Sequence, residues 1–161
     1  MSKKVEERRT FMFPILFLYR QFIELELKWI FLVYGKANRS ERVPLLRTSG
    51  HDLIRLWGLI EPVLLKESLA EDRSDVDTVG EYIKQFHELD KTSQRFRYPI
   101  AKNLDPMLDK QQQINLPNLR SRMDELYHFF NGVDGKLNSL SEVNEDISEY
   151  FDDAAEGLEE I

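Results

Sequence analysis

The chain has 161 residues, of which 42% are hydrophobic, and a formal net charge of −7. This length suits a single domain, residues 1–161, with a core of its own. Cysteine is absent, which excludes disulfides, thiolate metal sites and cysteine nucleophiles. The three histidines lie far apart and none has a second histidine at helical ligand spacing, so a histidine metal site is not expected, whereas magnesium bound by carboxylates stays open. No cofactor is expected.

The net charge is distributed unevenly along the chain. Residues 137–161 contain nine acidic side chains and no Lys or Arg, which leaves residues 1–136 at about +2. Residues 1–60 hold eleven basic and six acidic side chains. This excess permits an RNA-binding surface, although scattered solvated charge explains it better. The acidic tail could instead dock on a basic partner protein.

The most apolar stretch is FMFPILFLYRQFIELELKWIFLVY, residues 11–34, and the polar residues 1–9 before it are expected to be frayed. Read as a helix, this stretch carries one main apolar stripe, and further apolar residues extend the apolar surface nearly all around the helix. We therefore expect a central helix with neighbours on several faces. Gly35 is expected to end this helix. At helical spacing, the main stripe comprises Leu18, Phe22, Leu25, Trp29 and Val33.

A membrane span is the competing interpretation of this stretch. Arg20, Glu24 and Lys28 interrupt it, and each charge would be costly in hydrocarbon. Because they stand four residues apart, they can pair along one polar strip of a water-soluble helix. The basic start resembles a signal peptide, but no small-residue cleavage site follows. We therefore expect a cytoplasmic protein without a membrane partner.

The middle of the chain predicts two further helices. Residues 36–49 are basic and are interpreted as a loop. Pro62 is expected to bend the second helix without ending it, and Tyr98-Pro99 to end the third, because the residue before a proline is disfavoured in a helix. The apolar faces of the two helices comprise Leu53, Leu56, Trp57, Ile60 and Leu64, and Val76, Val79, Ile83, Phe86 and Leu89.

A fourth helix begins near Pro117 and carries apolar residues at steps of three and four. The same spacing continues into residues 137–161, which are expected to form an acidic amphipathic helix. Turn dipeptides within residues 131–136 leave open whether the helix kinks or turns there. Strand-like alternation is absent. The sequence predicts an all-α, up-and-down bundle of four to five antiparallel helices. The expected core positions of the fourth helix are Leu119, Met123, Leu126, Phe130, Val133, Leu137 and Leu140.

Two short motifs have residues that could bind or react. Arg95 and Arg97 flank Phe96 and could grip an RNA phosphate or stack on a base. Alternatively, Phe96 packs inward and the arginines cap carbonyls at a helix end. His51 beside Asp52 suggests an acid–base pair, but adjacent helical residues diverge by about 100°, so capping by Asp52 is the better interpretation.

A third motif is Arg122 and His128, separated by five residues in the fourth helix. Such a pair could cleave RNA without metal, with the histidine moving a proton and the arginine stabilising charge on the phosphate. Helical geometry places the two about 120° apart, so a joint site needs a dimer or a bend. The alternative is an exposed arginine and a histidine at the edge of the bundle.

Four segments in this order resemble the HEPN-like (higher eukaryotes and prokaryotes nucleotide-binding) helical proteins of bacteria. The resemblance extends over most of the chain, about residues 13–140, and rests on the combination of YRQFIELELKWIFL, GHDLIRLW, FHELDKTSQRFRYP and INLPNLRSRMDELYHFFNGV. The resemblance implies a helical bundle that commonly forms a homodimer. Many relatives are toxins or defence proteins that cut RNA with an arginine and a histidine four to six residues apart. Arg122 and His128 meet that spacing, but Met123 stands where catalytic relatives usually carry a polar residue.

The leading hypothesis is a non-catalytic or weakly catalytic dimeric module of a toxin–antitoxin or phage-defence system, acting through RNA or a partner protein. One alternative is a metal-independent endoribonuclease that uses Arg122 and His128 from two subunits. Another is a structural adaptor that docks through its acidic last helix.

Overall fold

The computed structural model describes residues 3–66, 73–97 and 114–159, with side chains described for residues 11–38, 40–66, 73–97 and 114–140. These residues form five α-helices and no strand, which confirms the all-α class. The helices are α1 (Lys3–Tyr34), α2 (Arg39–Ser49), α3 (Leu53–Lys66), α4 (Arg73–Leu89) and α5 (Leu116–Glu159).

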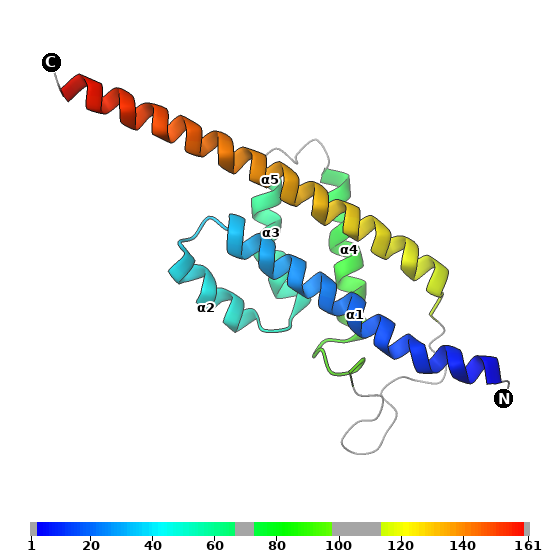
Figure 1. Ribbon diagram of the computed structural model, residues 1–161. Helices are drawn as coiled ribbons and strands as arrows, with labels where there is room; N and C mark the ends of the chain where they lie inside the picture. Colours follow the sequence, from blue (N-terminus) through cyan, green and yellow to red (C-terminus); the bar gives the residue numbers. More distant parts are fainter. Residues whose placement is uncertain (1–2, 67–72, 98–113, 160–161) are drawn as a thin grey trace.

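The two longest helices, α1 and α5, lie side by side and run in the same direction (Figure 1). Leu119 packs near Leu16 at one end of the pair. The hydroxyl of Tyr34 donates a hydrogen bond of 2.9 Å to Oδ1 of Asp134 further along both helices. Helices α3 and α4 pack behind them, so the core lies where α1, α3, α4 and α5 meet.

The apolar faces predicted for α3, α4 and α5 form this core. The last positions predicted on α4 and α5 are only half-buried, as is the first on α5. Pro62 lies inside α3, which continues to Lys66, as expected for a bend without a break. The buried residues that these three helices contribute are Leu53, Leu56, Trp57, Ile60, Val63, Leu64, Val76, Val79, Ile83, Phe86, Met123, Leu126, Phe130, Val133 and Leu137.

The end of α1 is as predicted, but the segment after it is a helix and not a loop. The Gly35 amide donates to the Phe31 carbonyl at 3.0 Å, and a Cβ at Gly35 would lie only 2.5 Å from that oxygen. Helix α2 then runs along the end of α1. Nη1 of Arg42 donates to the carbonyls of Leu32 at 2.5 Å and Val33 at 2.8 Å. Polar contacts of this kind attach α2 to α1, and residues 36–49 show no apolar periodicity. The sequence pattern therefore did not reveal α2.

Two other boundaries differ from the predicted ones. Helix α4 ends at Leu89, well before Tyr98-Pro99, which lies outside the described residues. Helix α5 is continuous through residues 131–136, so neither a kink nor a turn interrupts it. Helix α1 already begins at Lys3, within the segment that was expected to be frayed.

Candidate functional site

Arg122 of the predicted catalytic pair is already engaged within the chain. Its Nη1 donates to both carboxylate oxygens of Glu125, at 3.0 and 2.7 Å, and to the Tyr82 hydroxyl. The guanidinium carbon lies 5.3 Å from the centre of the Tyr82 ring. The hydrogen bond that Arg122 donates to Tyr82 and the charge of Glu125 raise the pKa of Arg122 above its ordinary value. Much of the positive charge that a phosphate would need is therefore neutralised by Glu125.

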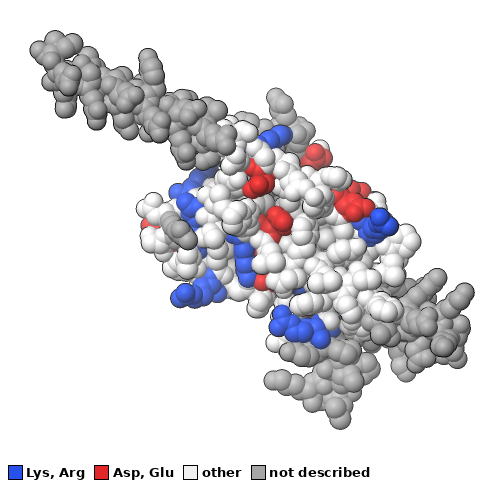
Figure 2. Space-filling model, viewed as in Figure 1, with Lys and Arg blue, Asp and Glu red and all other residues white. Residues whose placement is uncertain are grey.

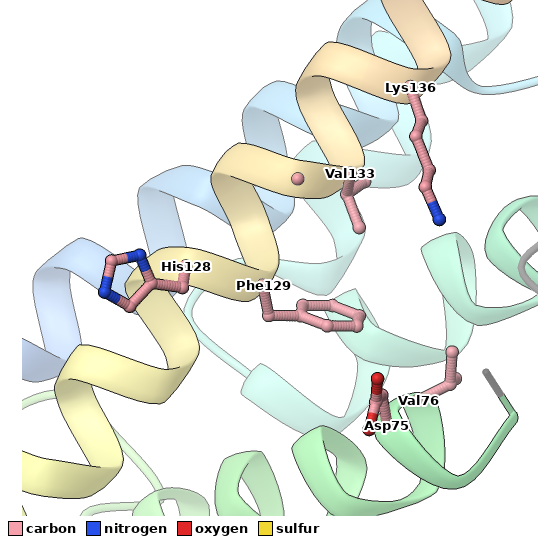
Figure 3. A pocket seen from close by; sticks show the side chains of 7 residues that line it. Asp75, Val76, His128, Phe129, Val133 and Lys136 are labelled. Atoms are coloured by element: carbon pink, nitrogen blue, oxygen red, sulfur yellow. The ribbon is translucent and has the colours of Figure 1, made fainter.

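His128, the other member of that pair, lies at the rim of a small pocket. It lines a pocket of about 160 Å³ between the start of α4 and α5, and Figure 3 shows its imidazole pointing away from the Phe129 ring. Its ring centre lies 5.6 Å from that of Tyr127. No described contact joins His128 to Arg122, so within one chain they do not form a joint site. Catalysis by this pair stays a prediction. Besides His128 and Phe129, the pocket is lined by Asp75, Val76, Gly132, Val133 and Lys136.

Arg95 and Arg97 sit in the turn that follows α4. Nη1 of Arg95 donates to the Leu89 carbonyl at 3.0 Å, which caps the last turn of the helix. Phe96 is buried, and its amide donates to Oδ2 of Asp90 at 3.3 Å. The guanidinium of Arg97 is exposed and lies 5.2 Å from the centre of the Phe17 ring. The inward position of Phe96 and the capping by Arg95 support the structural interpretation of this motif.

A buried cluster of charged side chains is centred on Arg20, whose side chain is fully buried. Arg20 donates from Nη1 to Glu24 Oε2 at 3.0 Å, from Nε to the Asp90 carbonyl at 3.0 Å and from Nη2 to the His51 carbonyl at 2.6 Å. One guanidinium therefore joins α1, the α2–α3 corner and the end of α4. The sequence predicted that Arg20 and Glu24 pair along a polar strip of a water-soluble helix. Their pairing four residues apart is confirmed, and both side chains are buried.

Glu24 completes this cluster as a buried carboxylate with three donors. Its Oε1 accepts hydrogen bonds from Lys28 Nζ at 2.6 Å and His51 Nδ1 at 2.8 Å, in addition to the bond from Arg20. Burial alone would raise the pKa of Glu24, but the bonds and charges of Lys28 and His51 outweigh it, so the pKa is lowered. The carboxylate is thus ionised and orients the exposed His51 ring. No sequence motif pointed to the bond between Glu24 and His51, because these two residues lie 27 positions apart.

Asp52 and Asp90 act on nearby backbone. Oδ1 of Asp52 accepts from the amides of Ile54 and Arg55 at 3.0 and 3.1 Å, which confirms its predicted capping role. The Nδ1 atom of His87 lies 3.6 Å from the same Oδ1, too far for a hydrogen bond, and is buried without a partner. Oδ1 of Asp90 accepts from residues 92 and 94, which redirects the chain after α4.

Helix α1 contacts α2, α3 and α5, as expected for a central helix, but the main apolar stripe predicted on it faces solvent. Figure 2 shows the face of the molecule where α1 and α5 lie in front, and uncharged residues (white) form most of the described surface there. The inward row of α1 (Leu16, Ile23, Leu27 and Ile30) packs in the core instead. We call the outward row the α1 stripe, and its exposed members are Phe11 (66%), Leu18 (62%), Leu25 (56%), Trp29 (55%) and Val33 (40%).

Comparisons of this chain with models of protein families, with curated proteins and with solved structures found no match. The class of this protein, an all-α helical bundle, therefore rests on the observed fold alone. Among the described residues, no cluster of three or more potential ligands could hold a metal ion. In the same part of the chain, no helix is both long and apolar enough to cross a bilayer.

Proposed function

We propose that this protein is a binding module that pairs with a second copy of itself through the α1 stripe. The observation that supports this function is the exposure of large apolar side chains along one face of a helix, with no charged residue among them. Covering apolar surface of this kind with another apolar surface removes it from water, which favours association. A self-complementary patch also needs only one partner, because a two-fold axis brings the same residues together.

The spacing of the stripe favours another helix as its partner. Together with the half-buried residues between them, the exposed members from Phe11 to Trp29 follow alternating steps of four and three, the pattern of helices that pack lengthwise. Within the described residues, only α1 presents such an exposed row, so a second α1 is the surface that fits it. These steps run through Phe11, Ile15, Leu18, Phe22, Leu25, Trp29 and Leu32, in which the half-buried Ile15, Phe22 and Leu32 accompany the exposed members of the stripe, and exposed Val33 follows Leu32.

The size of the stripe supports the same conclusion. With Tyr127, which is 52% exposed on the neighbouring α5, it presents six exposed large side chains. At about 150–250 Å² for each large apolar side chain, these fractions leave about 600 Å² on each copy. Pairing would bury about 1,200 Å² in total, which is at the lower end of specific interfaces and above most crystal contacts.

The resemblance to HEPN-like proteins supports a role in a bacterial toxin–antitoxin or phage-defence system, through RNA or a partner protein. The alternative of a metal-independent endoribonuclease also needs a dimer, because Arg122 and His128 would have to come from two copies. The contacts of Arg122 with Glu125 and Tyr82 favour the binding module. Incubating RNA with the protein in EDTA separates the two: cleavage that His128→Ala abolishes would establish the nuclease.

Analytical ultracentrifugation tests the proposed pairing. The wild type should sediment as a dimer, and Leu18→Asp should sediment as a monomer, because the aspartate would place a charge in the apolar contact. Leu45→Asp is the matched control, since Leu45 is 43% exposed on α2 and is not a member of the stripe. Circular dichroism should show equal helix content in all three. A wild type that stays monomeric at every attainable concentration would remove the proposal.

A further inference from the structure

A pocket of about 420 Å³ opens at the edge of the α1 stripe, between α1 and α5. Leu25 and Trp29 of the stripe form one side, and the carboxylates of Glu26 and Asp134 also line it. Helices α1 and α5 lie next to each other here (Figure 1). Any partner that covers the stripe therefore also covers this pocket.

The two carboxylates carry negative charge that nothing described in the chain neutralises. Neither Glu26 nor Asp134 has a Lys, Arg or His partner among the described side chains, and the Tyr34 hydroxyl on Asp134 is neutral. Burial, together with the charge of Asp134, raises the pKa of Glu26 above its ordinary value. Glu26 and Asp134 are half-buried, whereas the two fully buried carboxylates among the described residues, Glu24 and Asp90, have cationic or backbone N–H donors.

The indole of Trp29 adds a second feature that suits a cation. It is 55% exposed at the same pocket. Cations are attracted to aromatic faces, most strongly to tryptophan, and the attraction grows when water is excluded. The pocket thus combines negative charge, an aromatic face and an apolar rim.

We infer that this pocket receives a basic side chain, an ammonium or guanidinium, from the second copy that covers the α1 stripe. The inference rests on the proposed pairing. Covering two like charges without a cation would oppose the association, because buried charge is costly unless it is paired. The second copy carries exposed basic groups close to its own α1, at Lys36 just after the helix and at Arg97 over Phe17.

The double variant Glu26→Gln/Asp134→Asn tests whether a cation enters the pocket, because the dimer dissociation constant should change in opposite directions in the two cases. If a cation enters the pocket, the dimer dissociation constant should rise at least about tenfold, because a desolvated charge pair is lost. The dissociation constant should also lose most of its dependence on salt. If no cation enters, removing the repulsion should leave the constant unchanged or lower it, and that result would overturn the inference.

Glu81→Gln/Glu88→Gln is the matched control, because both carboxylates are exposed on α4, away from the stripe. It should leave the dissociation constant and its salt dependence as in the wild type. The result also separates the two proposals. A wild type that never dimerises overturns both, whereas a dimer that the double amide variant tightens overturns only the cation in the pocket.

Discussion

Nδ1 of His51 donates a hydrogen bond of 2.8 Å to Oε1 of Glu24, although the two residues lie 27 positions apart. The bond joins a side chain that is 58% exposed to a carboxylate that is 1% exposed. Because an ionised carboxylate can only accept, Nδ1 of His51 carries the proton in this bond. His51 is therefore the exposed end of a buried cluster of charged groups that connects three segments.

Removal of Arg20 should destabilise the protein strongly. In Arg20→Ala, Glu24 loses its buried cationic partner, and the carbonyls of His51 and Asp90 lose their donor. We expect the free energy of unfolding to fall by about 3–5 kcal/mol. Urea denaturation followed by circular dichroism measures it. Arg55→Ala, which removes an exposed ion pair, should cost no more than about 1 kcal/mol. Equal losses in the two variants would contradict a structural role for the buried cluster.

The stability of the protein should depend on the ionisation of Glu24 in acid. Its pKa is lowered in the folded state, so the folded form binds this proton less readily than the unfolded form. The stabilisation is complete above the ordinary value of 4.5 and is lost as the pH falls through the lower folded value. The loss should be smaller in Glu24→Gln, which is less stable at neutral pH. Unfolding in urea over a series of pH values measures both, and parallel curves for the two proteins would contradict the assignment.

In the monomer, ionisation of Glu26 should affect the stability of the protein in the opposite direction from ionisation of Glu24. Burial and the charge of Asp134 raise its pKa, so its ionised form costs stability at neutral pH and protonation relieves that cost as the pH falls. In a Leu18→Asp background, Glu26→Gln should raise the free energy of unfolding, by no more than about 1 kcal/mol because the site is partly solvated. A loss of stability at neutral pH would show that Glu26 has a stabilising partner.

Two glycines should respond to alanine in opposite directions. A Cβ at Gly35 would come within 2.5 Å of the Phe31 carbonyl oxygen, so Gly35→Ala must displace the end of α1. We expect a loss of about 1–3 kcal/mol. At Gly132, inside α5, a Cβ meets nothing within 4 Å, and alanine should stabilise the helix by about 0.5–1 kcal/mol. Thermal melts compare both with the wild type, and similar shifts in the two would refute the steric argument.

The apolar faces of α3, α4 and α5 could be predicted from the sequence because each of these helices has one apolar side. Spacing alone then identifies the buried residues, as at Ile60, Ile83 and Leu126. Local chemistry likewise identified the end of α1 at Gly35 and the cap at Asp52. The position of α2 could not be predicted in this way, because Arg42 attaches it to carbonyls of α1.

Helix α1 shows where such reasoning stops. It is apolar on two sides, and both rows, one through Ile23 and Leu27 and the other through Leu18 and Leu25, have helical spacing. The sequence by itself determined that α1 is a helix, that the protein is all-α, and that Arg20 and Glu24 can pair. Only the tertiary structure decided which row lies inside, because burial of Arg20 requires acceptors from His51 and Asp90. Those acceptors are brought to α1 by folding, and their position leaves the Leu18 and Leu25 row exposed.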